Sequence, residues 1–258
     1  MEQLIPKLPV FFLILVRLSA FFVTVPFFSY KTIPAKARIT LALVLAWMMT
    51  YSIQTTNVSI DENYAMLVLK EAIVGLLLGL VAFIIFSALQ IAGSFIDFQI
   101  GFAIANVIDP MTGAQSPLIG QFFQTLAMML LIATNGHYLL LDAIYFSYQY
   151  LPLQSAWPDF GDVAISVFIM KTFTTVFAIA FQMAAPVVAT IFLVDLALGI
   201  TAKTVPQLNI FVVGFPIKIG VSFIVLITMM SVMIAVMQKL FTVMFAAMRD
   251  FMVILGGG

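Results

Sequence analysis

The sequence predicts an all-α, polytopic membrane-type protein built from helical hairpins, and three observations support this fold class. Of its residues, 64% are apolar and only 9% are charged, against roughly 45–50% and about 25% in an average soluble domain. The charged residues form clusters that leave five uncharged stretches, at 39–60, 72–96, 110–141, 172–194 and 219–238. Each stretch is long enough for a helix that crosses a bilayer, which takes about 20 residues. Their continuous apolar content favours helices, because a membrane strand alternates apolar and polar residues.

The remaining global features exclude several classes of function. The formal net charge is zero, so the chain has no electrostatic footprint for nucleic acid. It contains no cysteine, which excludes disulfides and cysteine metal sites. The one histidine, His137, is part of no metalloprotease, hydrolase or phosphate-loop motif. We therefore expect no enzyme activity, no cofactor and no metal.

About six apolar segments are expected along the chain. The first three cover residues 8–28, 39–51 and 65–90. The loop between the first two is the most basic in the sequence, with Lys31, Lys36 and Arg38. Positive charge in a short loop favours the cytoplasmic side of a membrane, so the N-terminus is expected outside.

The other three segments cover residues 118–150, 163–200 and 210–237, and the last of them is expected to finish the chain outside. Three prolines fall inside apolar runs, at Pro26, Pro186 and Pro216. A proline removes a backbone donor and clashes with the preceding helical turn. Each of these three is therefore predicted to kink a helix.

A polar stripe is predicted on the helix that follows the third segment. Gln90, Ser94, Asp97 and Gly101 recur at i, i+4, i+7 and i+11, with Gly93 beside them, while Phe95 and Phe98 take the opposite face. An acidic residue at membrane depth normally faces a bundle interior or an aqueous cavity. The stripe is either a surface that lines a conduit or contacts a polar partner, or an ordinary helix face with a buried structural carboxylate.

A segment directly after this helix cannot continue it. Two prolines and a glycine forbid a regular helix there. Irregular backbone at membrane depth is tolerated only when it is buried in protein or lines a cavity. The segment is therefore either a re-entrant plug or gate, or a plain connecting loop, and its residues are Asn106, Asp109, Pro110, Met111, Thr112, Gly113, Ala114, Gln115, Ser116 and Pro117.

Gly75 and Gly79 form a GxxxG pattern within an apolar segment. Such spacing lets another helix approach closely. Together with the polar stripe, it favours contact with other subunits over contact with lipid.

Among the charged residues inside apolar segments, we interpret Arg17, Glu71, Asp195 and Lys218 as intramembrane charges. Arg17 has three candidate partners in Glu71, Asp97 and Asp195, or it extends towards the membrane surface. Asp195 and Lys218 stand at similar distances on either side of a short polar turn and are candidates to pair across it. That turn contains Lys203, Pro206, Gln207 and Asn209, and it predicts a helical hairpin.

In the order and spacing of its motifs the sequence resembles the FliR family of flagellar export-gate proteins, which is related to the T-type proteins of virulence type III secretion. The motifs that carry the resemblance are Arg17 with Pro26, Pro34 and Arg38; the run 71–79; Asp97-Phe98-Gln99-Ile100-Gly101; Asp109-Pro110 with Pro117; and the run 203–218. They cover most of the chain.

The resemblance implies a subunit of the flagellar type III protein export gate in the bacterial cytoplasmic membrane, within the flagellar basal body. Its implied partners are FliP-like and FliQ-like subunits, an FlhB-like subunit at the cytoplasmic entrance, and the unfolded flagellar proteins that pass through. It also implies a FliP-like part over residues 1–162 and a FliQ-like C-terminal hairpin over residues 163–258. Residues 106–117 match the channel plug, and the turn at 203–209 faces the cytoplasmic entrance.

Two rival interpretations stay open at this point. Broken helices and intramembrane carboxylates are also typical of secondary transporters, in which Asp97 and Asp195 would couple ion movement. The other rival is a purely structural scaffold.

Overall fold

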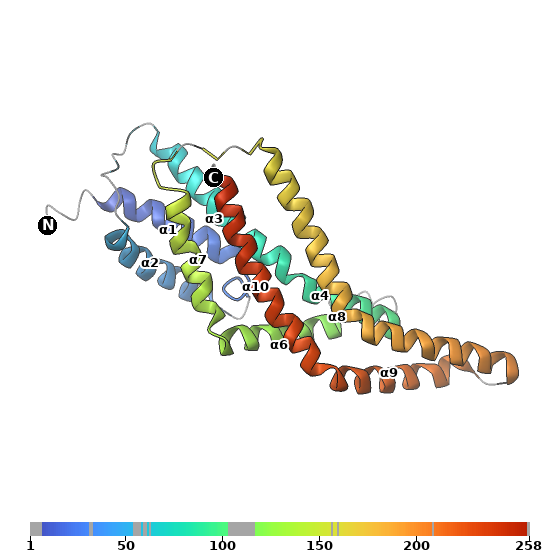
Figure 1. Ribbon diagram of the computed structural model, residues 1–258. Coiled ribbons are helices and arrows are strands. Elements are labelled where there is room, and N and C mark those ends of the chain that lie inside the picture. Colours follow the sequence, from blue (N-terminus) through green and yellow to red (C-terminus); the bar gives the residue numbers. More distant parts are fainter. Residues whose placement is uncertain are drawn as a thin grey trace. The chain divides into compact units, whose positions relative to one another are not determined.

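The protein is described here by a computed structural model that covers residues 7–30, 33–53, 58, 61, 63–102, 117–155, 157–158, 160–207 and 209–256. Its regular structure within these ranges is entirely α-helical, with no strand (Figure 1). This confirms the predicted fold class.

Three helical segments in the described ranges are long and apolar enough to cross a membrane, namely Tyr64–Ile100, Val163–Thr204 and Met230–Leu255. A fourth is added if Leu118–Ala133 and Gly136–Tyr150 are taken as one broken span. Two shorter apolar helices, Leu8–Thr24 and Val212–Thr228, complete the apolar set. The chain is thus polytopic in type, although residues 39–51, expected as a span, do not belong to this set.

The chain forms two compact units, each assembled from separate stretches of sequence. The first unit consists of Met1–Phe86, Ile132–Phe173 and Thr242–Gly258, and the second consists of Ser87–Leu131 and Thr174–Phe241. The predicted FliP-like and FliQ-like parts, which meet at residue 162/163, stay a prediction.

The first unit is organised around helix α1 (Leu8–Thr24), which packs against α2 (Ala35–Ser52) and α3 (Tyr64–Phe86) (Figure 1). Leu13, Ile14, Leu18 and Phe21 of α1 are fully buried. Ile14, Leu18 and Phe21 follow one another at spacings of four and three residues, which put their side chains on one helix face, and Leu13 is adjacent to Ile14. Helix α7 (Gly136–Tyr150), the start of α8 and the end of α10 complete this unit.

Pro26 does not kink a helix, contrary to expectation. Helix α1 ends at Thr24, and Val25 already has the extended backbone of a C-cap. Phe27 then adopts a positive φ of 80°. Pro26 therefore lies in the turn that follows the helix, a position in which its missing N–H costs no helical hydrogen bond.

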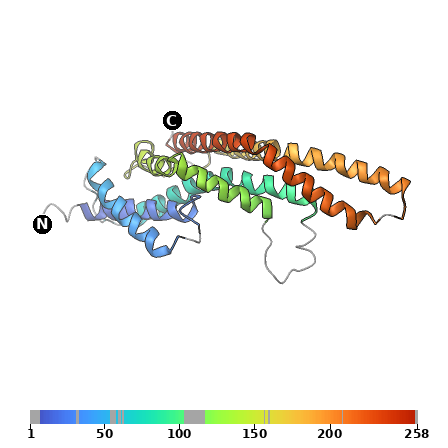
Figure 2. The ribbon, with the colours of Figure 1, turned by 90° about the horizontal axis from the view of Figure 1, so that it is seen from below.

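The second unit contains α4 (Ala88–Ile100), most of α6 (Leu118–Ala133), the later part of α8 (Val163–Thr204), α9 (Ile210–Thr228) and the start of α10 (Met230–Leu255). Helices α8 and α9 form a hairpin and lie side by side in both views (Figures 1 and 2). Pro186 and Pro216 lie inside α8 and α9 respectively, and the kinks expected at these two positions stay a prediction.

Besides the run 65–90, which is divided at Ser87 between α3 and α4, two predicted segments are divided by breaks. The run 118–150 is interrupted at Asn135, whose φ of 58° is left-handed; asparagine tolerates this conformation better than other non-glycine residues. The expectation that one segment at 210–237 finishes the chain is wrong, because α9 ends at Thr228 and α10 runs on to Leu255. Residues 226–233 contain neither proline nor glycine, and we find no physical reason for this second break in the sequence.

Candidate functional site

The first unit contains a fully buried ion pair between α1 and α3. Arg17 Nε donates to Glu71 Oε2 at 2.6 Å, and Arg17 Nη2 donates to Glu71 Oε1 at 2.9 Å. Both side chains are 0% exposed. This bidentate geometry, with two N–H groups donating to the two carboxylate oxygens, is the strongest form of an arginine–carboxylate contact. Of the partners that the sequence left open for Arg17, the structure selects Glu71.

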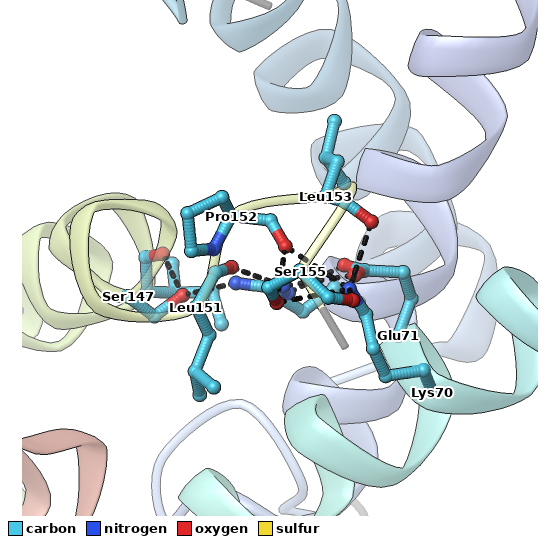
Figure 3. Close-up of polar contacts among 9 residues, drawn as sticks. Lys70, Glu71, Ser147, Leu151, Pro152, Leu153 and Ser155 are labelled. Carbon is cyan, nitrogen blue, oxygen red and sulfur yellow. Dashed lines mark hydrogen bonds and ion pairs between the residues drawn. The ribbon is translucent and has the colours of Figure 1, made fainter. Parts of the chain in front are cut away.

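The same arginine also contacts the end of α7. Its Nη1 donates to Ser147 Oγ at 2.9 Å, and its Nη2 donates to the Leu151 carbonyl oxygen at 2.9 Å (Figure 3). The guanidinium carbon lies 3.9 Å from the centre of the Tyr148 ring. Arg17 therefore links α1 to both α3 and the C-terminal turn of α7, where a helix favours positive charge.

Lys70 adds a second buried cation that the sequence analysis did not single out. Its Nζ donates to the carbonyl oxygens of Pro152, Leu153 and Ser155 at 3.0, 2.7 and 3.2 Å (Figure 3). Glu71 Oε1 lies 3.5 Å from the same nitrogen. The cluster of Arg17, Lys70 and Glu71 thus carries two cations and one anion, and backbone oxygens compensate the excess positive charge. In the sequence, the signal that could have identified Lys70 was its position next to Glu71 inside an apolar segment.

Glycines let α3 approach α1 at this cluster. A Cβ on Gly75 would overlap the Arg17 carbonyl oxygen, and one on Gly79 would overlap Thr24 Oγ1 and the Val25 nitrogen. The interpretation that this face meets another subunit is therefore wrong, because α1 of the same chain covers it. Close backbone approach is the physical use of such glycines in apolar helices.

In the second unit, Asp97 of the polar stripe lies at the N-terminus of α6. The Ile119 N–H donates to Asp97 Oδ2 at 3.1 Å, and Oδ1 is 3.4 Å from the same nitrogen. A helix N-terminus has unsatisfied N–H groups and a positive dipole end, both of which favour a carboxylate. The geometry matches the structural-carboxylate interpretation, and a conduit role for the stripe stays a prediction.

The other members of the stripe also have contacts within the chain. Ser94 Oγ donates to the Gln90 carbonyl oxygen at 2.9 Å. A Cβ on Gly93 would overlap the backbone of Gly120, which makes Gly120 a packing residue that the sequence analysis missed. Gly101 has a φ of 103°, and its Cβ position is occupied by the Phe215 ring. Phe95 and Phe98 are exposed on the opposite face, as the helical spacing predicts.

Replacing Asp97 by alanine is expected to lower the free energy of unfolding by about 1–2 kcal/mol, because it removes the acceptor and the negative charge from the α6 N-terminus. Asp97→Asn, which keeps one acceptor oxygen, should lose less. Thermal unfolding of the purified chain in detergent measures the difference. The exposed neighbour provides the control, since Phe95→Ala should change stability by less than about 0.5 kcal/mol. Equal losses in Asp97→Ala and Phe95→Ala would refute the capping role.

Asp195 and Lys218 form an ion pair across the α8–α9 hairpin. Gln99 Nε2 of α4 donates to the other carboxylate oxygen of Asp195 at 3.0 Å. These three side chains border a cavity of about 330 Å³ between α4, α8 and α9. The pairing that the sequence allowed is therefore present, and it also ties the hairpin to α4.

The remaining predicted residues are placed as follows. The turn residues Lys203, Pro206, Gln207 and Asn209 are all exposed, and the Asn209 carbonyl oxygen accepts the N–H groups of Val212 and Val213 at the start of α9. Residues 106–116 of the predicted plug lie outside the described residues. Pro117 is described and half-buried, and its carbonyl oxygen accepts the Gln121 N–H. Within the described residues, no group of three or more His, Asp or Glu side chains is placed to share a metal ion.

Comparison with known proteins decides the family. The family model described as bacterial export proteins, family 1, matches residues 8–244. The chain belongs to this family of bacterial export proteins. The match covers the buried ion pair, the polar stripe and the hairpin alike, and it confirms the family resemblance predicted from the sequence motifs.

Individual relatives of this bacterial export protein agree with that assignment. It is 54% identical over 257 residues to the flagellar biosynthetic protein FliR of Bacillus subtilis (strain 168), covering 99% of both chains. It is 26% identical over 250 residues to FliR of Escherichia coli (strain K12), covering 96% of this chain and 95% of the other. Yop proteins translocation protein T of Yersinia pestis is 33% identical over 172 residues, or 66% of this chain and 65% of the relative.

Proposed function

We propose that this protein is a subunit of the flagellar type III protein export gate, and that with FliP-like and FliQ-like subunits it forms the channel through which unfolded flagellar proteins leave the cell. An FlhB-like subunit is its partner at the cytoplasmic entrance, and the complex lies in the cytoplasmic membrane within the flagellar basal body. Its role is passage of a polypeptide and not catalysis. The observation that carries the proposal is the 54% identity to a flagellar biosynthetic protein over essentially the whole length of both chains.

The surface of the hairpin supports a role inside a larger assembly. Val212, Ile224 and Ile227 of α9 and Leu193 and Ile200 of α8 are each more than 60% exposed. Apolar surface of this extent has to be covered by lipid or by other subunits. A gate subunit meets this requirement because it packs against its neighbours.

Within this proposal, residues 106–117 act as the channel plug and the turn at 203–209 faces the cytoplasmic entrance. The support for the plug is its composition, since Pro110, Gly113 and Pro117 prevent a helix between apolar neighbours. Irregular backbone of this kind is tolerated at membrane depth where it lines a cavity.

The transporter interpretation gains no support from the two carboxylates on which it depends. Asp97 accepts a backbone N–H at the start of α6, and Asp195 is paired with Lys218 and Gln99. An ion-coupling carboxylate has to exchange its ligand during transport. Both groups instead have contacts that hold helices together.

The proposal is tested by purifying the tagged chain from its native membrane in mild detergent. We expect it to co-purify in stable proportion with FliP-like and FliQ-like subunits, because its exposed apolar faces need protein neighbours. Removing residues 106–117 should leave this complex intact but make cells permeable to small ions. Recovery of the wild-type chain alone, or as a homodimer, would contradict the gate assignment; an intact complex with unchanged permeability after the deletion would contradict only the plug assignment.

A further inference from the structure

A groove in the first unit is not explained by the contacts described above. It lies between α7 and residues 242–252 of α10, with a volume of about 740 Å³. Its walls are mostly apolar and aromatic, but each contributes one charged side chain, Asp142 from α7 and Arg249 from α10. Both views show the two helices running next to each other (Figures 1 and 2).

Asp142 and Arg249 lie at similar positions along the length of the groove. A Cβ on Gly256, just after α10, would come within 2.6 Å of the Tyr150 carbonyl oxygen at the end of α7, so the C-terminal ends of both helices meet. Asp142 precedes Tyr150 by eight positions and Arg249 precedes Gly256 by seven. At about 1.5 Å per residue, both charges lie roughly 10–12 Å from the joined ends.

Neither charge is compensated across the groove. The Asp142 side chain forms no hydrogen bond or ion pair with any part of the chain that the structure describes. Arg249 is 68% exposed, and its nearest carboxylate is that of its exposed neighbour Asp250, at 4.0 Å. An ion pair of that length between exposed groups contributes little. The groove therefore presents one negative and one positive side chain without strong partners.

The position of Asp142 in a candidate membrane span indicates whether lipid or protein fills the groove. Asp142 belongs to the middle turn of α7, which is half of a candidate membrane span. An uncompensated carboxylate facing hydrocarbon is costly, so such groups normally face protein or water and pair with opposite charge. Acyl chains of a lipid offer Asp142 no counter-charge. A protein side chain does.

We propose that this groove, defined as the α7–α10 groove, receives an apolar helix of a neighbouring subunit that places a basic side chain against Asp142 and an acidic side chain against Arg249. The inference rests on the proposed function, because it requires other subunits. Phe146 and Tyr150, 46% and 39% exposed, line the groove. Aromatic residues in a partly polar groove are the usual anchors of a protein interface.

The experiment places a photoreactive benzoylphenylalanine at position 146 and irradiates the detergent-purified complex. The expected product is an adduct with another subunit, and mass spectrometry should place a Lys or Arg within one helical turn of the attachment point. Asp142→Lys should lower the adduct yield by at least about tenfold, because like charges would then face each other. Asp250→Lys is the matched control, since this neighbouring carboxylate does not line the groove, and it should leave the yield unchanged. Replacing the partner's basic residue by Glu should restore the yield in the Asp142→Lys background.

Several results would overturn the inference while leaving the proposed function intact. They are adducts with lipid alone, with a second copy of this chain or with its own residues, no protein adduct at all in a complex that contains the other subunits, or equal yields in Asp142→Lys and Asp250→Lys. If the wild-type chain purifies without other subunits, the proposed function itself fails. The two failures are therefore distinguishable.

Discussion

Replacing Glu71 by methionine is expected to lower the free energy of unfolding by about 3–5 kcal/mol, the largest effect of any single substitution discussed here. The variant removes the only anion from a fully buried cluster and leaves Arg17 and Lys70 as two like charges. Arg17→Met should cost less, because Lys70 remains 3.5 Å from the Glu71 carboxylate and keeps it paired. Denaturation of the purified chain in detergent, or the amount of folded chain recovered from membranes, measures which of the two variants is less stable.

The double variant Arg17→Met/Glu71→Met separates the ion pair from simple loss of packing. It removes one charge of each sign and leaves Lys70 with its three backbone oxygens, so it should be more stable than Glu71→Met alone. Lys36→Met is the control, because Lys36 is exposed and its replacement should change stability by less than about 0.5 kcal/mol. A Glu71→Met variant as stable as the control, or a double variant no better than Glu71→Met, would show that the cluster does not hold this unit together.

The second large effect is expected at the contact between α4 and α6. A helical glycine replaced by alanine normally gains about 1 kcal/mol from helix propensity. At Gly93, however, the added Cβ would overlap the backbone nitrogen and Cα of Gly120, and backbone atoms cannot rotate away as a side chain does. Overpacking of this kind costs about 1–3 kcal/mol. We therefore expect Gly93→Ala to destabilise the isolated chain, as measured by its thermal unfolding in detergent.

Gly220 of α9 offers a control with the opposite expected sign. A Cβ at this position meets nothing within 4 Å in the chain, so only the propensity gain of up to about 1 kcal/mol should remain. Gly220→Ala is thus expected to be neutral or stabilising for the isolated chain. If both variants shift stability in the same direction, close helix contact does not account for Gly93.

The buried cluster and the glycine contacts explain how an apolar chain specifies one arrangement of helices. Apolar packing alone is weakly directional, and helices of similar composition can slide past one another. The Arg17–Glu71 pair and the carbonyl contacts of Lys70 have directional geometry. They fix the register of α1, α3 and the end of α7, at the cost of burying charge.

Local sequence signals predicted some boundaries and not others. The polar turn predicted at 203–209 matches the observed gap between α8, which ends at Thr204, and α9, which begins at Ile210. The break at Asn135 is accompanied by an Asn-Gly pair, a known turn signal, yet the apolar composition of 118–150 favoured one continuous segment. The break between α9 and α10 has no local signal.

The sequence by itself determined the helical class, the membrane-type composition and the family, because these depend on apolar run length, charge spacing and motif order along the chain. The tertiary structure decided which partner each charge takes. Arg17 had three candidate carboxylates, and Glu71 is the partner because Gly75 lets α3 approach α1 closely. In the same way Asp97, read from the sequence as part of a polar stripe, lies at the start of α6 because Gly93 and Gly120 bring these two helices into contact. Such choices depend on distances between residues far apart in the chain, which helical periodicity does not encode.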